Sequence, residues 1–169
     1  SMGHRNPQGL QFIKNKENYL ISTEHGPKGG DEINIINIKK INNYGWPLAS
    51  YGTHYDVVPL NNFTQKYAPL KKNHTKNNFE EPIYYFKESI GISEIINNNF
   101  SNDKNDYFVT SLKNESIYNF NIKNNSNQEL EKIVIGERIR DIIYDDNSES
   151  YYLYLEDSPV VAKLSISQK

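Results

Sequence analysis

The segment Tyr107 to Ile122 reads YFVTSL (107–112), KNE (113–115) and SIYNFNI (116–122). Aromatic and β-branched residues fill the two outer runs, and the polar triplet between them has the length of a hairpin turn, so the segment predicts two antiparallel strands. Leu130 to Ile135 reads as a third strand after a polar turn at 123–128. The sequence therefore predicts a three-stranded meander over 107–135.

The same pattern of short strands and polar turns continues on both sides of this meander. Strands are predicted at 10–13, 19–23, 32–38, 82–86, 91–96, 140–144, 151–156 and 160–165. Helix signals are nearly absent. Residues 51–81 follow neither the strand period nor the helix period, so we expect a long surface excursion there, and its length suggests a site or an interface.

Meanders of three or four strands that recur about every 45 residues are typical of β-propeller blades. We therefore predict an all-β chain of about three four-stranded antiparallel blades, formed by the runs 10–46, 82–135 and 140–165. The chain would be a single partial propeller domain over residues 1–169, with blades at roughly 3–60, 80–135 and 136–169 and the excursion at 51–81. A sandwich of about eight to ten strands is the alternative on pattern alone.

The composition limits the class of protein. With 169 residues the chain is long enough for one domain with a buried core. A formal net charge of -2 gives no basic surface field, so nucleic acid is not an expected partner. The lack of cysteine excludes a disulfide scaffold, a thiolate zinc site and a cysteine nucleophile. No apolar run reaches the roughly 20 residues of a membrane span, and the first residues do not predict a signal peptide.

The arginines are the first candidates for binding residues. The chain has 19 lysines and arginines, of which only Arg5, Arg138 and Arg140 are arginine, so the bidentate guanidinium is expected to matter where it occurs. In the extended segment GERIRD (136–141), Arg138 and Arg140 would share one face with Ile139 behind them. Two guanidinium groups about 6 to 7 Å apart can bind carboxylates or phosphates. The alternative is a pair of solvated surface charges.

Five motifs in order resemble a known family. They are GHRNPQGL (3–10), EHGP with GGDEIN (24–27 and 29–34), NYGWP (43–47), SLK (111–113) and RIRD (138–141). Their order resembles that of soluble quinoprotein glucose and aldose sugar dehydrogenases. The resemblance implies a six-bladed propeller that uses pyrroloquinoline quinone (PQQ) and calcium. It covers nearly all of this chain but only the C-terminal half of the family's domain, so the chain would form a half-ring.

The resemblance also implies site residues. The cofactor-binding residues would be Arg5, Asn6, Lys113, Arg138 and Arg140. The main-chain carbonyls of Gly26 and Pro27 would hold the calcium that polarises the quinone, and carbonyl oxygens suit this hard ion. Glu32 and the carbonyl of Tyr44 would bind a second, structural calcium. The neighbours of His25, and not its imidazole, would carry the family role, with a substrate contact as the alternative. Trp46 is expected to pack in the core or in its turn, with a sugar platform as the alternative.

The implied reaction is hydride transfer from the anomeric carbon of an aldose sugar to PQQ, in a periplasmic or secreted protein. No catalytic residue is assigned, because the family's general-base histidine would lie upstream of the motif at 3–10, outside this chain. The alternative is a non-catalytic half-propeller that binds or assembles. A homodimer, or a missing N-terminal half, would then complete the six-bladed ring and cover the open edges of the outer blades.

Overall fold

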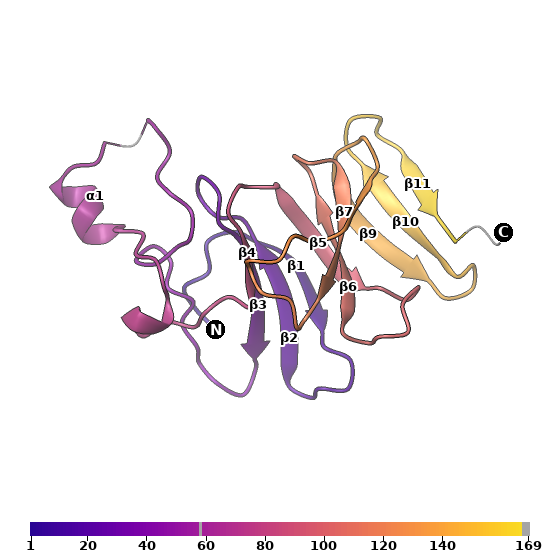
Figure 1. Cartoon of the computed structure of the whole chain (residues 1–169), viewed down its shortest axis with the longest axis horizontal. Helices are drawn as coiled ribbons and strands as arrows, with labels where there is room; N and C mark the ends of the chain where they lie inside the picture. Colours follow the sequence, from indigo (N-terminus) through magenta and orange to yellow (C-terminus); the bar gives the residue numbers. More distant parts are fainter. Residues whose placement is uncertain (58, 167–169) are drawn as a thin grey trace.

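The computed structural model describes residues 1–57 and 59–166, and its strands form three antiparallel sheets that lie side by side (Figure 1). The first sheet contains β1 (Pro7–Phe12), β2 (Tyr19–Glu24), β3 (Asp31–Asn37) and β4 (Tyr84–Phe86). The second contains β5 (Ile92–Asn97), β6 (Asp106–Ser111), β7 (Ser116–Asn121) and β8 (Lys132–Val134). The third contains β9 (Ile139–Asp145), β10 (Ser150–Leu155) and β11 (Val161–Leu164).

The three sheets are arranged as consecutive blades of a β-propeller. The first strands of the sheets are neighbours, since β5 contacts both β1 and β9. One hydrophobic core includes Ile21 and Ile33 of the first sheet together with Tyr107 and Phe120 of the second. A second core joins the second sheet to the third and includes Phe108, Ile117, Ile142, Tyr151 and Leu153. The all-β propeller prediction is therefore confirmed, and the two-sheet sandwich does not form.

One detail of the predicted blades was wrong. The strand predicted at 82–86 was assigned to the second blade, but β4 pairs antiparallel with β3, with Asp31 opposite Phe86 and Ile33 opposite Tyr84. The first blade thus includes Phe86, because the chain leaves β3, makes the excursion and returns to the same sheet. In the described part of the chain the third blade has three strands, which match the three predicted at 140–144, 151–156 and 160–165.

The excursion contains a little regular structure that the sequence pattern did not predict. Helix α1 (Asn62–Tyr67) begins at Asn61, whose side chain accepts hydrogen bonds from the N–H groups of Phe63 and Thr64. A short 3₁₀-helix, η1 (Thr75–Asn77), follows. No residue of α1 is buried, which explains why it lacks an apolar period. Figure 1 shows the excursion at the end of the molecule opposite to β11.

Buried polar contacts join the sheets near their first strands. The hydroxyl of Thr23 in β2 donates to the carbonyl of Ser93 in β5 at 2.6 Å. The hydroxyl of Ser93 donates in turn to the carbonyl of Ile139 in β9, also at 2.6 Å. Because all three sheets take part, these contacts fix the blades relative to one another.

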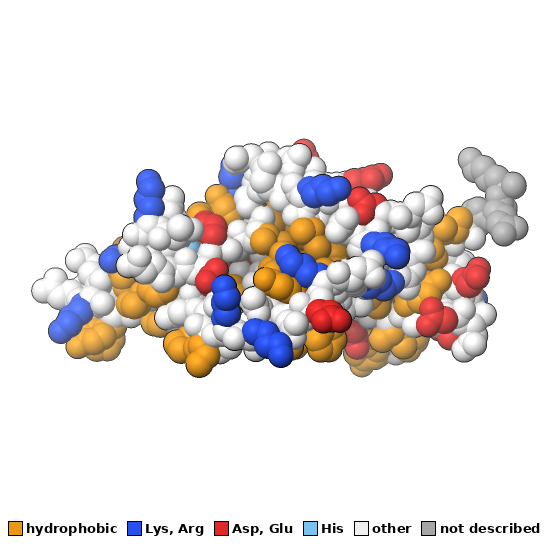
Figure 2. Space-filling view, turned by 90° about the horizontal axis from the view of Figure 1, so that it is seen from below, with side chains coloured by type: hydrophobic (Ala, Val, Ile, Leu, Met, Phe, Trp, Pro, Cys, Tyr) orange, Lys and Arg blue, Asp and Glu red, His pale blue; other side chains and the backbone are white. Residues whose placement is uncertain are grey.

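The surface combines charged and hydrophobic side chains. Figure 2 shows hydrophobic side chains along the whole length of one face, with lysine, arginine and acidic side chains between them. Leu10 and Phe12 of β1 are 60% and 66% exposed. Within the described residues, no helix has the length and apolar character needed to cross a membrane.

Candidate functional site

The loop between β2 and β3 contains Gly26 and Pro27, the predicted calcium-binding pair, and it is tightly folded. Both residues are buried. A Cβ atom on Gly26 would lie 2.0 Å from the carbonyl oxygen of Gly29, so no larger residue fits at this position. The main-chain N–H of Gly26 donates to the buried carboxylate of Asp31 at 3.1 Å. The loop is therefore held in one conformation by close backbone packing and by Asp31.

This loop offers oxygen atoms that suit a hard cation. No described residue donates a hydrogen bond to the carbonyl oxygen of Gly26 or of Pro27. Buried carbonyl groups are normally paired, so two free carbonyls in sequence fit a calcium ion as their partner. Among the described residues there is no group of three or more His, Cys, Asp or Glu side chains that could hold a metal ion. A calcium ion at this loop would depend on main-chain oxygens.

A small cavity beside this loop brings four of the predicted site residues together. Its volume is about 10 Å³, room for about one water molecule or ion. Arg5, Gly26, Glu32 and Tyr44 line it. The other lining residues are Gly3, Glu24, His25, Trp46, Ala49 and Ser50. Segments that are far apart in the sequence thus converge on one point next to the first sheet.

Arg5 is fixed at this cavity from several sides. Its Nη1 donates to the carbonyl of His25 at 3.3 Å, and its main-chain N–H donates to Oε2 of Glu24 at 2.7 Å. Its guanidinium lies 5.2 Å from the ring centroid of Trp46, a cation–π contact. The sequence predicted only a turn-packing role for Trp46, and the proximity of Arg5 depends on the tertiary structure.

A larger cavity of about 590 Å³ lies between the Gly26–Pro27 loop and the second sheet. Pro27 and Lys113, both predicted site residues, line it together. The remaining lining residues are Lys28, Gly29, Tyr51, Thr53, Tyr55, Lys87, Glu88 and Ser89. Its volume is in the range of small-molecule sites. The excursion, whose length suggested a site or an interface, contributes Tyr51, Thr53 and Tyr55, which the sequence did not single out.

Arg138, which directly precedes β9, and Arg140, within β9, both point to the same carboxylate, as the predicted shared face implied, and Ile139 between them is fully buried. Both guanidinium groups bind one carboxylate: Arg138 Nε lies 2.7 Å from Oε2 of Glu156, and Arg140 Nη2 lies 2.5 Å from Oε1. Their hydrogen bonds hold the pKa of Glu156 below its ordinary value. The pair is therefore already arranged to bind a carboxylate from two sides.

The two cavities do not include every predicted residue. Asn6, Arg138 and Arg140 do not line either of them. Asn6 is exposed, and its side-chain oxygen accepts a hydrogen bond from Gln8 at 3.0 Å. The field of Arg140 nevertheless reaches His25, whose pKa is lowered mainly by burial and also by Arg5 and Arg140, while Asp31 opposes this shift. The charges of two predicted site residues, Arg5 and Arg140, therefore both act on His25.

Glu32 is a buried carboxyl group in the small cavity. Burial raises its pKa to about 8, and the nearby charge of Glu24 acts in the same direction. The amide of Asn34 opposes this shift, since it donates to Oε2 of Glu32 at 3.4 Å as well as to Glu24. At neutral pH and without a cation beside it, Glu32 is therefore protonated.

Because the pKa of Glu32 is raised, we expect the folded chain to become less stable as the pH rises. The folded chain keeps the Glu32 proton up to about pH 8, whereas an unfolded chain loses it near 4.5, so alkaline conditions favour unfolding between these values. The pKa values of His25 and His74 are lowered, which acts in the opposite sense below about pH 6.5. From about pH 6.5 to 8 we expect a loss of about 2 kcal/mol in the free energy of unfolding.

Urea unfolding with a calcium chelator at several pH values measures this slope. The variant Glu32→Gln is expected to remove most of it, and Glu129→Gln, at an exposed position, is the matched control. A Glu32→Gln variant that keeps the slope of the unsubstituted chain would contradict the assignment.

The second predicted calcium site has a different neighbour. Glu32 and Tyr44 do lie together on the small cavity. However, the imidazole of His74, from the excursion, lies against Glu32, with Nε2 3.7 Å from Oε1. Glu24 lines the same cavity, so two buried carboxylates, the residue Tyr44 and a nearby imidazole meet at this point.

The fold and these loops define the class of the protein as a β-propeller with loops from adjacent blades around two cavities. The chain belongs to the Glucose / Sorbosone dehydrogenase family, whose family model matches residues 1–161. It is therefore a member of a family of sugar dehydrogenases.

Individual relatives agree with this family. Aldose sugar dehydrogenase YliI of Escherichia coli (strain K12) is 32% identical over 170 aligned positions, which cover 98% of this chain and 43% of that protein. Quinoprotein glucose dehydrogenase B of Acinetobacter calcoaceticus is 53% identical over 52 residues, which are 30% of this chain and 10% of that protein. A crystal structure titled as glucose dehydrogenase matches with a TM-score of 0.77 and 28% identity, over 98% of this chain and 46% of its own. The chain thus spans less than half the length of these proteins.

Proposed function

We propose that this chain is the cofactor-binding part of a PQQ-dependent aldose dehydrogenase. The observation that carries the proposal is the larger cavity, where the Gly26–Pro27 loop and Lys113 meet, while the charges of Arg5 and Arg140 both act on His25 of the same loop. A relative with 53% identity over 52 residues is named as a quinoprotein, which supports the choice of cofactor. The membership of this chain in the Glucose / Sorbosone dehydrogenase family supports an aldose as the substrate class.

Different residues would bind the PQQ carboxylates and the calcium ion. PQQ carries three carboxylates, and Arg5, Lys113, Arg138 and Arg140 would supply the cations that neutralise them, with Asn6 as a polar contact. The carbonyls of Gly26 and Pro27 would hold calcium. A quinone held by these residues would supply an acceptor for the hydride of the anomeric carbon of the sugar, and calcium would make it a better acceptor. Removal of the hydroxyl proton is assigned to no residue of this chain. Export to the periplasm is a part of the same proposal.

Titration of the purified chain with PQQ, in calcium and in a chelator, tests the proposal. We expect a dissociation constant in the micromolar range with calcium, since several charge-assisted contacts contribute. Lys113→Met is expected to weaken binding about tenfold, whereas Lys132→Met, an exposed lysine of β8, is the matched control and should leave it unchanged. A chain that binds no PQQ at about 100 μM would contradict the proposal. A dye-linked assay with an aldose then measures turnover.

A specific observation also favours assembly with further blades. The outer face of the third sheet exposes Ile143 (59%), Tyr154 (48%) and Val161 (65%), and Tyr154 pairs directly with Val161 across β10 and β11. Such a face is normally covered in a propeller. We propose that it is covered either by a second copy of this chain or by the half of the ring that the chain does not contain. Size-exclusion chromatography with light scattering separates these cases: a dimer supports self-association, and a strict monomer contradicts it.

A further inference from the structure

The first sheet has an outward face that the second sheet does not cover. Ile21 and Ile33 pack toward the second sheet in the core that the two sheets share. Because side chains alternate along a strand, the paired residues Phe12 of β1 and Leu20 of β2 lie on the opposite face. Phe12 is exposed, and so is Leu10, which lies on the same face two residues earlier. This outward face is therefore apolar and open along β1.

The third sheet has a similar outward face at the other end of the chain. Tyr151 and Leu153 pack toward the second sheet, so Tyr154 and its partner Val161 lie on the face that points away from it. These two residues and Ile143 on the same face are exposed. The row of three sheets thus has an open apolar face at each end.

The turns beside these two faces have opposite charges. A set of exposed lysines, here called the basic end, follows β1 and β3 of the first sheet. It consists of Lys14, Lys16, Lys39 and Lys40, with Glu17 as the acidic residue among them. The β9–β10 turn of the third sheet, here called the acidic turn, contains Asp145, Asp146 and Glu149, with Lys163 of β11 beside it. Within the described part of the chain, none of these side chains forms an ion pair.

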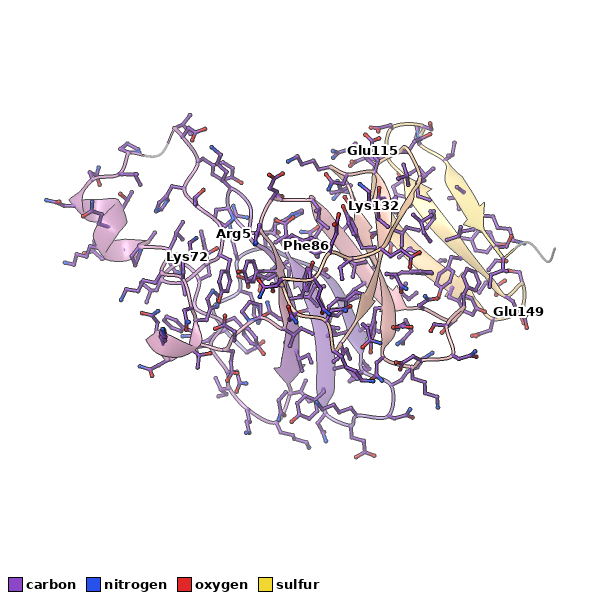
Figure 3. The ribbon with its side chains drawn as sticks, in the orientation of Figure 1. Arg5, Lys72, Phe86, Glu115, Lys132 and Glu149 are labelled. Carbon is purple, nitrogen blue, oxygen red and sulfur yellow. The ribbon has the colours of Figure 1, made fainter. Side chains whose placement is uncertain are left out.

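The basic end and the acidic turn lie on the same side of the molecule. At this side, Gln11 Oε1 accepts a hydrogen bond from the N–H of Asn97 at 2.8 Å, and Lys14 Nζ donates to Oδ1 of Asn99 at 2.9 Å. The hydroxyl of Tyr151, just after the acidic turn, donates to the carbonyl of Asn97 at 2.6 Å. Figure 1 shows the β1–β2 and β9–β10 turns on its lower side, and Figure 3 shows Glu149 at the outer end of the third sheet.

The contact between Lys14 and Asn99 shows how neighbouring blades meet at this side. The turn after the first strand of one blade lies beside the corresponding turn of the next blade. A blade added next to the third sheet would therefore bring its own first turn to the acidic turn. The β1–β2 turn of a second copy would bring lysines to this position.

We propose that two copies of this chain close head to tail into one ring. The outward face of the first sheet of each copy would cover the outward face of the third sheet of the other, and each acidic turn would meet a basic end. Because this contact is made twice, no open face remains for a third copy. The chain covers 46% of the glucose dehydrogenase structure, so two copies supply about the same length. The inference rests on the self-association proposed above and is independent of the cofactor.

Reversal of the charges tests the contact. Lys16→Glu with Lys39→Glu, and separately Asp146→Lys with Glu149→Lys, place like charges at both contacts of a dimer, so each variant is expected to dimerise at least about tenfold more weakly. An equal mixture of the two variants should form a heterodimer about as tight as the unsubstituted dimer, because each reversed turn then meets the opposite charge. Sedimentation equilibrium measures these constants. Lys123→Glu with Lys132→Glu is the matched control on the second sheet and its following turn, and it should leave the dimer unchanged.

The apolar faces have a test of their own. Phe12→Ser is expected to weaken the dimer at least about tenfold, since it removes an aromatic side chain from the covered face. Phe63→Ser is the matched control, because Phe63 of α1 is 69% exposed, close to the 66% of Phe12, and lies in the excursion. The Tm of each variant checks that it is folded.

Three results would overturn the proposal. They are a chain that stays monomeric at about 200 μM, a dimer that neither charge reversal weakens, and folded variants whose mixture forms no heterodimer. The second and third results would refute the head-to-tail contact even where the chain self-associates. The PQQ titration can fail without changing any of these results, so the two hypotheses are tested separately.

Discussion

Replacing both Arg138 and Arg140 by methionine is expected to weaken PQQ binding by about 10²- to 10³-fold. A hydrogen bond to a charged group contributes about 1.5 to 3 kcal/mol, and a factor of ten corresponds to about 1.4 kcal/mol. The two arginines already hold the carboxylate of Glu156 from both sides, so little rearrangement is needed to bind a ligand carboxylate. Both side chains are about 40% exposed, so the folded chain loses little stability with them.

The measurement is a PQQ titration followed by absorbance, with Tm as the check on folding. The matched control is Lys123→Met with Lys132→Met, which removes two exposed positive charges elsewhere and gives the same net charge. If the two double variants weaken binding equally, only net charge matters and the specific role of the arginines is refuted. An unchanged dissociation constant in the arginine variant would refute it as well.

The largest loss of stability is expected from Asp31→Ala. The side chain is fully buried and accepts hydrogen bonds from the N–H groups of Gly26, Ile90 and Ile92 at 3.0 to 3.2 Å and from the hydroxyl of Ser89. The Asp31 carboxylate therefore connects the Gly26–Pro27 loop to the start of the second blade. Leaving these donors unpaired costs about 3 to 5 kcal/mol, which corresponds to a Tm lower by about 8 to 15 °C.

Thermal unfolding by circular dichroism measures this change. Asp56→Ala is the control, because Asp56 pairs with Lys28 at the surface and is 86% exposed, and it should change Tm by less than about 2 °C. Asp31→Asn keeps one acceptor oxygen and is expected to lie between the control and Asp31→Ala. An Asp31→Ala variant as stable as the control would contradict the role assigned to this carboxylate.

The parts of the fold that sequence could predict are those built from local contacts. The meander over 107–135 follows from strands that are neighbours both in sequence and in the sheet, joined by short polar turns. The partner of β4 could not be found in this way, because the excursion separates it from β3. Helix α1 was missed for a similar reason: it buries no residue and so leaves no apolar period.

In the candidate site, too, sequence could predict the features that depend on local contacts but not those that depend on tertiary contacts. The shared face of Arg138 and Arg140 follows from the alternation of side chains in an extended segment. Their partner Glu156 directly follows β10, and no local sequence signal points to it. His74 lies in a polar segment where nothing in the sequence distinguishes a buried histidine from an exposed one. The resemblance to a family identified the loop of Gly26 and Pro27, yet it could not reveal a histidine beside Glu32, since that contact belongs to this chain.

The return of the chain to the first sheet at β4 has a consequence for divergence within the family. Both ends of the excursion are anchored in one blade, so insertions and deletions in it leave the order and spacing of the blades untouched. The excursion supplies Tyr51, Thr53 and Tyr55 to the larger cavity. The Gly26–Pro27 loop and the three arginines are not part of the excursion. Variation of this segment alone can therefore reshape the larger cavity, while the groups proposed to hold the cofactor stay in place.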